Sequence, residues 1–174
     1  LEKHKPFTDL IRTLDRMNYT YTKKLICCES YGVAQKRTRL VLLASRLGKI
    51  ELLPETYEPD NYRTVRDAIG HLEKINAGGS SEMDPIHRCQ KLSLLNKRRI
   101  EKSIPGGTWR DWDDDMVCPC HKKQTGTTYI SVYGRMSWDE PSPTITTQFY
   151  NYGSGRFGHP EQDRALSLRE GANL

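Results

Sequence analysis

Three polar residues at alternate positions, Gln35, Arg37 and Arg39, lead directly into an apolar run in the segment YGVAQKRTRLVLLAS. Alternate residues of an extended chain project to the same side, so the spacing predicts an array of amide and guanidinium groups there. An arginine can donate two parallel hydrogen bonds to a phosphate or a base carbonyl, and glutamine both donates and accepts. The array fits a nucleic acid, although two arginines on a solvated strand edge would give the same pattern.

A second group of basic residues lies on the predicted helical segment 90–103. Leu92 and Leu95 can face inward, which leaves the basic side chains either along a phosphate backbone or simply in solvent. The following SIPGGTWRDW combines glycines that permit close backbone approach with tryptophans around Arg110, although a tight turn with buried tryptophans would read alike. The candidate DNA contacts here are Arg98, Arg99, Lys102 and Arg110.

A third polar stretch, RMSWDEPSPTITTQFYNYGSGRFGHP, follows nearer the end of the chain. Pro141 and Pro143 favour an extended backbone, and the glycines after them favour a flexible polar loop. Such a segment can fill a DNA groove, or it can merely connect two elements. The candidate contacts here are Arg135, Thr144, Thr146, Thr147 and Arg156.

The chain has 5 cysteines without regular spacing, which favours reduced thiols over a disulfide framework. The stretch VCPCHKK, with Cys118, Cys120 and His121, invites a zinc interpretation. Structural zinc sites usually place two or more residues between paired ligands and need a second pair elsewhere, so ordinary reduced thiols are the simpler hypothesis. A small zinc-dependent interaction domain stays as an alternative.

Composition limits the class of protein. The 174 residues carry a net charge of +5, which is compatible with a polyanionic partner. With 36% hydrophobic and 28% charged residues, we expect a modest core and a polar surface. The sequence has no apolar run of bilayer length and no signal-peptide core, so it predicts a soluble, cytoplasmic protein without a membrane partner. It also lacks a glycine fingerprint for phosphate and a serine, histidine and acid arrangement, so no complete active site is visible.

Periodicity predicts the elements that must position these residues. Helix, strand, polar turn and buried strand at the start of the chain indicate the flank of an α/β sheet, and frequent Pro and Gly after Ser45 indicate a loop-rich insertion. At the end, Ser167 is predicted to cap a helix, with Glu170 as its capping-box partner. The predicted helices are 7–17, 64–72, 90–103 and 166–174, and the predicted strands are 19–28 and 40–44.

Taken in order, GVAQKRTRLVLLAS, TVRDAI, RRIEKSIPGGTWRDW, YGRMSWDEPSPTITT and GRFGHPEQDRALSLRE closely resemble the second half of a cytosine-5 DNA methyltransferase, over essentially the whole chain. In that family QxRxR before an apolar strand is the eighth motif, HP with R-x-L-S-x-R-E is the ninth, and the target-recognition region lies between them. The resemblance implies the edge of a doubly wound, Rossmann-like methyltransferase sheet, an α/β fragment, plus a loop-rich α+β target-recognition domain. It assigns 1–53 to the catalytic domain, 54–158 to target recognition and 159–174 to the start of the ninth-motif helix.

The resemblance also implies roles and partners. In the family a target cytosine is flipped out of duplex DNA and methylated at C5 from S-adenosylmethionine. Arg39 would hold the flipped base at its carbonyl, with Gln35 and Arg37 fixing the neighbouring backbone and the catalytic loop. We therefore expect double-stranded DNA as the partner and an enzyme of bacterial restriction-modification type, or alternatively a non-catalytic DNA-binding module that works with a separately encoded cofactor-binding half.

Several family motifs do not occur in this sequence. The aromatic-glycine cofactor loop, the Pro-Cys nucleophile loop and the Glu-Asn-Val motif precede the eighth motif in the family, and the tenth follows the ninth. Cys120 follows Pro119 but lies after the eighth motif, so we do not take it as the nucleophile. The chain starts at Leu1 and stops within a predicted helix, so we expect a fragment. Without its N-terminal catalytic half it should bind no S-adenosylmethionine, be inactive and self-associate.

Overall fold

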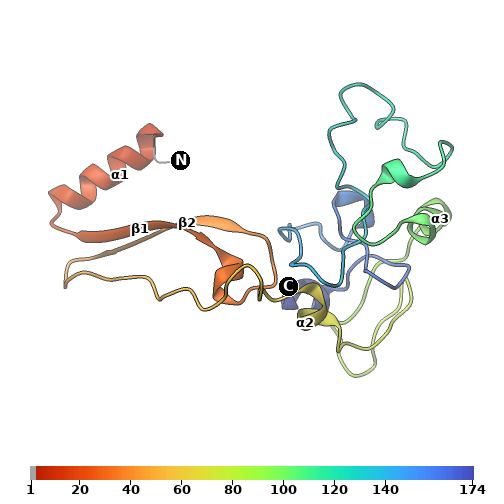
Figure 1. Ribbon diagram of the computed structural model, residues 1–174, viewed down its shortest axis with the longest axis horizontal. Coiled ribbons are helices and arrows are strands. Elements are labelled where there is room, and N and C mark those ends of the chain that lie inside the picture. The colour runs from red at the N-terminus through yellow and green to blue at the C-terminus, as the bar shows by residue number, and fades with distance from the viewer. Residues whose placement is uncertain (1–2) are drawn as a thin grey trace.

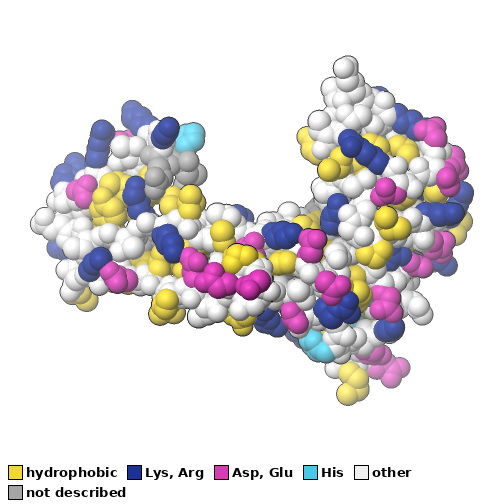
Figure 2. Space-filling model, in the orientation of Figure 1, with side chains coloured by type: hydrophobic (Ala, Val, Ile, Leu, Met, Phe, Trp, Pro, Cys, Tyr) yellow, Lys and Arg dark blue, Asp and Glu magenta, His cyan; other side chains and the backbone are white. Residues whose placement is uncertain are grey.

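A computed structural model describes residues 3–174, so Leu1 and Glu2, which the predicted catalytic segment 1–53 includes, lie outside the described part. Figure 1 shows an elongated arm made by the N-terminal elements and a rounder body made by the rest of the chain, with the C-terminus near the place where the two meet. On the face shown in Figure 2, basic and acidic side chains are interspersed over both parts. No helix among residues 3–174 is long and apolar enough to cross a membrane.

The arm consists of a helix and a two-stranded sheet. Helix α1 (Lys5–Arg16) begins with a proline in its first turn, where the missing amide hydrogen costs nothing. Strand β1 (Thr20–Cys27) pairs antiparallel with β2 (Thr38–Ser45), and the short 3-10 helix η1 (Cys28–Tyr31) begins the connection between them. The predicted helix and both predicted strands of this region are confirmed, with ends shifted by a few residues.

The burial expected of the second strand is not observed. The residues of β2 are exposed or half-buried, and none is fully buried. A two-stranded sheet with one helix beside it provides too little structure to enclose an apolar strand. Within residues 3–174 the regular strands are β1 and β2 alone, so the doubly wound parallel sheet stays a prediction.

The body is built from long loops that connect short helices. The helices are α2 (Val65–Ile69), α3 (Leu94–Lys102) and α4 (Leu168–Asn173), and single turns of 3-10 helix form η2 (Trp109–Asp111) and η3 (Tyr152–Ser154). Each body helix is shorter than its predicted segment. The predicted cap is confirmed, because the Ser167 hydroxyl accepts from the Glu170 amide and the Glu170 carboxylate accepts from the Ser167 amide.

Two groups of buried apolar side chains form the core of the body. The first packs α2 against residues that flank α4 and against loop residues from the arm connection and from the third polar stretch, and the second packs α3 against the segments that contain η2 and η3. The buried members include Val65, Ile69, Met136 and Leu166 in the first group and Ile100, Trp109, Trp112 and Tyr152 in the second.

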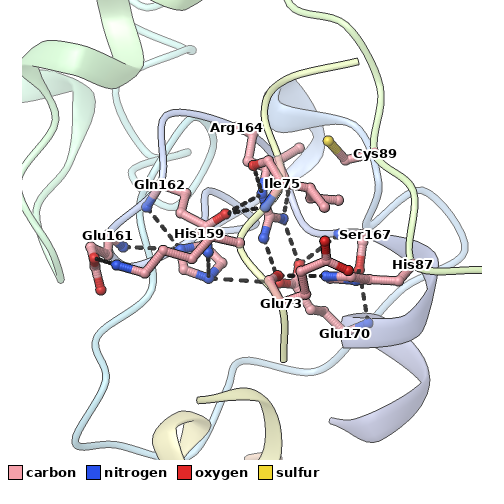
Figure 3. A network of polar contacts seen from close by, with 12 residues as sticks. Glu73, Ile75, His87, Cys89, His159, Glu161, Gln162, Arg164, Ser167 and Glu170 are labelled. Carbon is pink, nitrogen blue, oxygen red and sulfur yellow. Dashed lines mark hydrogen bonds and ion pairs between the residues drawn. The ribbon is translucent and has the colours of Figure 1, made fainter. Parts of the chain in front are cut away.

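A buried polar network holds the C-terminal segment in place (Figure 3). Arg164 is fully buried and donates two hydrogen bonds, of 2.7 and 2.6 Å, to the carboxylate of Glu170. Its Nε atom donates to the carbonyl of Ile75 at 3.0 Å, which ties residues 159–170 to an earlier loop. Burial opposes ionisation of Glu170, but the hydrogen bond and charge of Arg164 outweigh it and lower the pKa of that carboxyl.

Candidate nucleic-acid interface

The segment with Gln35 is paired with the proline-rich segment of the third polar stretch, more than a hundred residues later. Lys36 donates its amide to the Ser142 carbonyl at 2.7 Å, and Ser142 donates its amide to the Ala34 carbonyl at 2.9 Å, as in a parallel bridge. The Thr144 hydroxyl donates to the Lys36 carbonyl at 2.7 Å. These bonds join the arm to the body at one place, which we call the junction, made by residues 34–37 and 140–145.

The side chain of Gln35 holds the junction together through hydrogen bonds to backbone groups of the body. Its amide is only 8% exposed. The Nε2 atom donates to the Leu174 carbonyl at 3.2 Å, and the Oε1 atom accepts from the Ile145 amide at 3.2 Å. Both ends of the side-chain amide are therefore occupied within the chain, so Gln35 positions backbone and is not placed to contact a ligand directly.

The two arginines of the array keep their guanidinium groups available. Arg37 is half-buried, and its side chain forms no ion pair with any residue of 3–174. Arg39 lies in β2 opposite Ile26 and is exposed, and within the described residues its guanidinium donates only to the carbonyl of its neighbour Thr38, at 2.7 Å. Both can still form bidentate hydrogen bonds with a phosphate or a base.

An open pocket of about 290 Å³ lies at the junction, and its charged lining residues are Lys36, Glu140 and Arg156. The Lys36 ammonium is 2.7 Å from the Glu140 carboxylate, and this hydrogen bond lowers the pKa of Glu140. Both side chains are more than half exposed, so the pair is weak and can give way to a phosphate. Gly106, also in the lining, has a φ of 74° and open space beside its Cα, so backbone can approach a ligand closely there.

Arg156 holds the glycine turn beside this pocket. Its Nη1 atom donates to the carbonyl of Gly107 at 2.5 Å and to that of Arg135 at 3.3 Å. Arg156 is also one of the residues that line the pocket. Thr146 and Thr147 lie on the exposed continuation of the same polar stretch as Thr144, which is half-buried in the junction.

Three of the residues predicted to contact phosphate are exposed in the structure. Arg98 and Lys102 are exposed on α3, and Arg98 lies 3.6 Å from the carboxylate of Asp115 in an ion pair that is mostly in solvent. Arg110 is exposed in η2, donates to the Thr127 carbonyl at 2.9 Å and lies over the ring of Trp109. These three cations are placed where a polyanion can reach them.

The structure contradicts the prediction that Arg99 contacts DNA. It is 6% exposed, and its Nε atom donates to the Met116 carbonyl at 2.8 Å. Its guanidinium lies over the rings of Trp112 and Tyr133, at 5.4 and 5.1 Å from their centroids. The helix turns each residue by about 100° from the one before, so Arg99 faces the core while Arg98 faces solvent. Arg99 is a core residue.

Arg135 requires the same correction. Its side chain is 6% exposed, and its guanidinium donates to the carbonyls of Ile100, Ser103, His159 and Gln162 and to the carboxylate of Asp163. All of its donors are used within the protein. The physical reason is that the surrounding loops leave many carbonyls without partners in helices or sheets, and one buried fork of donors satisfies them.

The side chains of Cys118, Cys120 and His121 also lie close together. The two sulfur atoms and an imidazole nitrogen are within 4.8 Å of one another, and the His121 ring stacks on Trp109 at a centroid distance of 4.6 Å. All five cysteines are free thiols.

Sequence reasoning missed Lys36 and Glu140. Strict alternation placed Lys36 on the side opposite Gln35 and Arg37, but β2 begins only at Thr38, and the irregular backbone before it turns Lys36 toward the pocket. Nothing local in the sequence pairs residue 36 with residue 140. The sequence indicated a link between the two segments only through the motifs that carry the family resemblance, since both segments belong to them.

The junction thus combines available guanidinium groups on Arg37 and Arg39 with an open pocket lined by Lys36, Glu140 and Arg156, an arrangement compatible with a polyanionic ligand. The family model for C-5 cytosine-specific DNA methylase matches residues 1–174. The chain belongs to this family, as the motifs predicted.

Curated relatives agree. A type II methylase, M.HgiDII of Herpetosiphon aurantiacus, is 51% identical over 168 residues, which cover 97% of this chain and 48% of the relative. The type II methyltransferase M1.BsuMI of Bacillus subtilis (strain 168) is 31% identical, over 99% of this chain and 39% of its own length. DNA (cytosine-5)-methyltransferase 3 of Arabidopsis thaliana is 30% identical, over 92% of this chain and 15% of its own length. The chain thus spans about half or less of the length of these relatives.

Proposed function

We propose that this chain is the DNA-recognition half of a DNA (cytosine-5-)-methyltransferase of restriction-modification type. Such an enzyme would transfer a methyl group from S-adenosylmethionine to C5 of a cytosine flipped out of duplex DNA. The observation that carries the proposal is the junction, where Gln35 is locked by hydrogen bonds while Arg37 and Arg39 keep available guanidinium groups. Family membership and the type II names of M.HgiDII and M1.BsuMI support the restriction-modification assignment.

The junction suits a flipped base because it combines fixed backbone with available donors. A base that leaves the helix needs donors for its polar edge and cations for the phosphates that flank it. Arg39 would hold the carbonyl of the flipped cytosine, and Arg37 would fix the neighbouring backbone. Gln35 sets the position of both, because its amide ties the start of the array to the body.

The exposed cations of the body would bind the phosphates of the DNA duplex from which the base is flipped. Arg98, Lys102 and Arg110 face solvent on α3 and η2, and the pocket at the junction adds Lys36 and Arg156. Phosphate contacts of this kind supply most of the affinity for DNA without reading its sequence. In this proposal, residues 54–158 read the target and residues before 54 and after 158 belong to the sheet of a Rossmann-like catalytic domain.

The chemistry would depend on a second half of the protein. The chain matches only 48% of the length of M.HgiDII, and the family motifs for the nucleophile and the cofactor are not among its residues. We therefore assign the cysteine nucleophile and the binding of S-adenosylmethionine to the remaining half. The chain alone should bind DNA, bind no cofactor and transfer no methyl group.

Radiolabel transfer tests this division of roles. The purified chain is incubated with duplex DNA and S-[methyl-³H]adenosylmethionine, first alone and then together with the N-terminal half of its parent protein. We expect label in DNA only in the combined sample. Label transferred by the chain alone would contradict the division, and its absence from the combined, folded and DNA-bound sample would contradict the enzymatic proposal.

A further inference from the structure

A cluster of soft metal ligands lies in the recognition loop 113–130, within the body and apart from the junction. The Sγ atoms of Cys118 and Cys120 and an imidazole nitrogen of His121 are within 4.8 Å of one another. The cluster contains no carboxylate, and thiolate with imidazole is the ligand set that suits zinc and disfavours magnesium or calcium. We propose that Cys118, Cys120 and His121 bind a zinc ion that fastens this loop to the body.

The distances nearly fit a tetrahedral site. With bonds of about 2.3 Å to sulfur and about 2.0 to 2.1 Å to nitrogen, donor atoms around zinc lie roughly 3.5 to 3.8 Å apart. Since no two donor atoms are more than 4.8 Å apart, the cluster has to contract by at most about 1 Å to reach this geometry. Cys120 is exposed, so rotation of its side chain can supply the movement without repacking of the core.

The ring of His121 is held in place by its neighbours. The ring is 7% exposed and is stacked on Trp109 with an angle of 13° between the planes. Its Nδ1 atom lies 3.3 Å from the carbonyl of Gly126, to which a protonated Nδ1 donates. This tautomer leaves the lone pair of Nε2 free for a metal, in the same way that outer hydrogen bonds orient histidine ligands in zinc proteins.

The loop backbone closes around the cluster. His121 donates its amide to the Cys118 carbonyl at 2.9 Å, in a turn that brings the ligands together. Farther along, a Cβ at Gly126 would lie only 1.8 Å from the Cys120 carbonyl oxygen, so only glycine allows the chain to return so closely. Trp109 anchors the far side by donating from its indole nitrogen to the Tyr129 carbonyl at 2.8 Å.

Three protein ligands leave one position of a tetrahedron open. The ring of Tyr133 packs edge-on against the ring of His121, with 6.3 Å between the centroids. A water molecule would complete the site. Cys89 lies elsewhere, bonded to the Asn76 carbonyl at 3.2 Å, so it belongs to a different part of the body.

Cobalt titration tests the proposal. The purified chain, reduced with a phosphine, is titrated with Co²⁺, whose tetrahedral thiolate complexes absorb in the visible and near ultraviolet, and then with Zn²⁺ as competitor. Cys120→Ser removes one ligand at an exposed position, and Cys27→Ser is the matched control at an exposed cysteine of β1. Trypsin cleavage after the exposed Lys122 and Lys123 reports whether the metal fastens the loop.

We expect one equivalent of tetrahedral cobalt in the wild-type chain and in Cys27→Ser, displaced by zinc, with at least tenfold weaker binding in Cys120→Ser. Zinc should also slow cleavage after Lys122 and Lys123 several-fold in the wild-type chain only. A wild-type chain without the tetrahedral spectrum would overturn the proposal, and so would equal binding by the folded Cys120→Ser variant. Far-ultraviolet circular dichroism establishes that the variants are folded.

Discussion

Replacement of Arg135 by lysine should damage folding rather than DNA contact. Arg135 lies in the third polar stretch, and its sequence position alone suggested a phosphate contact. In the structure its guanidinium donates to four buried or half-buried carbonyls and to the Asp163 carboxylate. Lysine keeps the charge but has three donors at one point, so it cannot reach carbonyls that lie around a planar fork.

The expected cost follows from the bonds that lysine leaves unmade. Each hydrogen bond from a charged donor contributes about 1.5 to 3 kcal/mol, and a buried acceptor without a partner costs about 1 to 3 kcal/mol. If lysine replaces about half of the contacts, Arg135→Lys should lower the free energy of unfolding by about 3 to 5 kcal/mol. That is a large part of the stability of a domain of this size.

Arg98→Lys is the matched control. Arg98 lies in a second predicted DNA-contacting segment, but its ion pair with Asp115 is 3.6 Å long and its side chain is 64% exposed. A surface pair of this kind contributes less than about 1 kcal/mol. Urea unfolding followed by tryptophan fluorescence measures stability, and fluorescence anisotropy with a labelled duplex measures binding at two salt concentrations.

The two variants should separate. Arg135→Lys should move the urea midpoint strongly downward, while its folded fraction keeps the salt dependence of DNA binding. Arg98→Lys should leave the midpoint in place. An Arg135→Lys protein with a wild-type urea midpoint and weakened binding would refute the reasoning, since it would show that the guanidinium serves DNA and not the fold.

Three further expectations concern catalysis, acid stability and association. In the full-length enzyme, Arg39→Ala should lower the rate of single-turnover methylation about ten- to a hundredfold with little loss of duplex affinity. Arg98→Ala should instead weaken binding to all DNA sequences and reduce the slope of the salt dependence by about one. A wild-type methylation rate for Arg39→Ala would count against a base contact. The free energy of unfolding should fall by about 2 kcal/mol between pH 7 and 5, because burial lowers the pKa of His159 from 6.5 to about 4 and the unfolded chain therefore takes up the proton first. In urea titrations at the two pH values, His159→Asn should make this fall smaller. An equally steep fall in the variant would contradict the assignment to His159. The chain should self-associate through the arm, where Leu25 is 66% exposed, so Leu25→Lys should shift sedimentation toward monomer, and a wild-type monomer at high concentration would exclude this.

Local patterns predicted the elements of the arm and the last helix. The alternation and apolar spacing of residues 5–45 depend on neighbours in sequence, and so does the capping box of Ser167 and Glu170. The middle of the body was less predictable, because its helices are short and much of its order comes from polar groups such as Arg164, which bond to distant carbonyls.

The candidate site shows the same limit. Local spacing identified Gln35, Arg37 and Arg39, but it could not show that Gln35 faces inward to the Leu174 carbonyl while Arg39 stays exposed. Nor could it distinguish Arg98 from Arg99, since residue type is identical and only the packing of Trp112 and Tyr133 decides which one is buried. Charge predicted a basic surface, and long-range contacts decide which cations belong to it.

A segment exchange tests the central claim most directly. Residues 54–158 of the full-length parent are replaced by the corresponding segment of M1.BsuMI, and bisulfite sequencing maps methylated cytosines in a random duplex library for the parent, the chimera and M1.BsuMI. If residues 54–158 read the target, the chimera should still methylate cytosine at C5 but at the sites used by M1.BsuMI. A chimera that is folded and active yet methylates the sites of its parent would contradict the account.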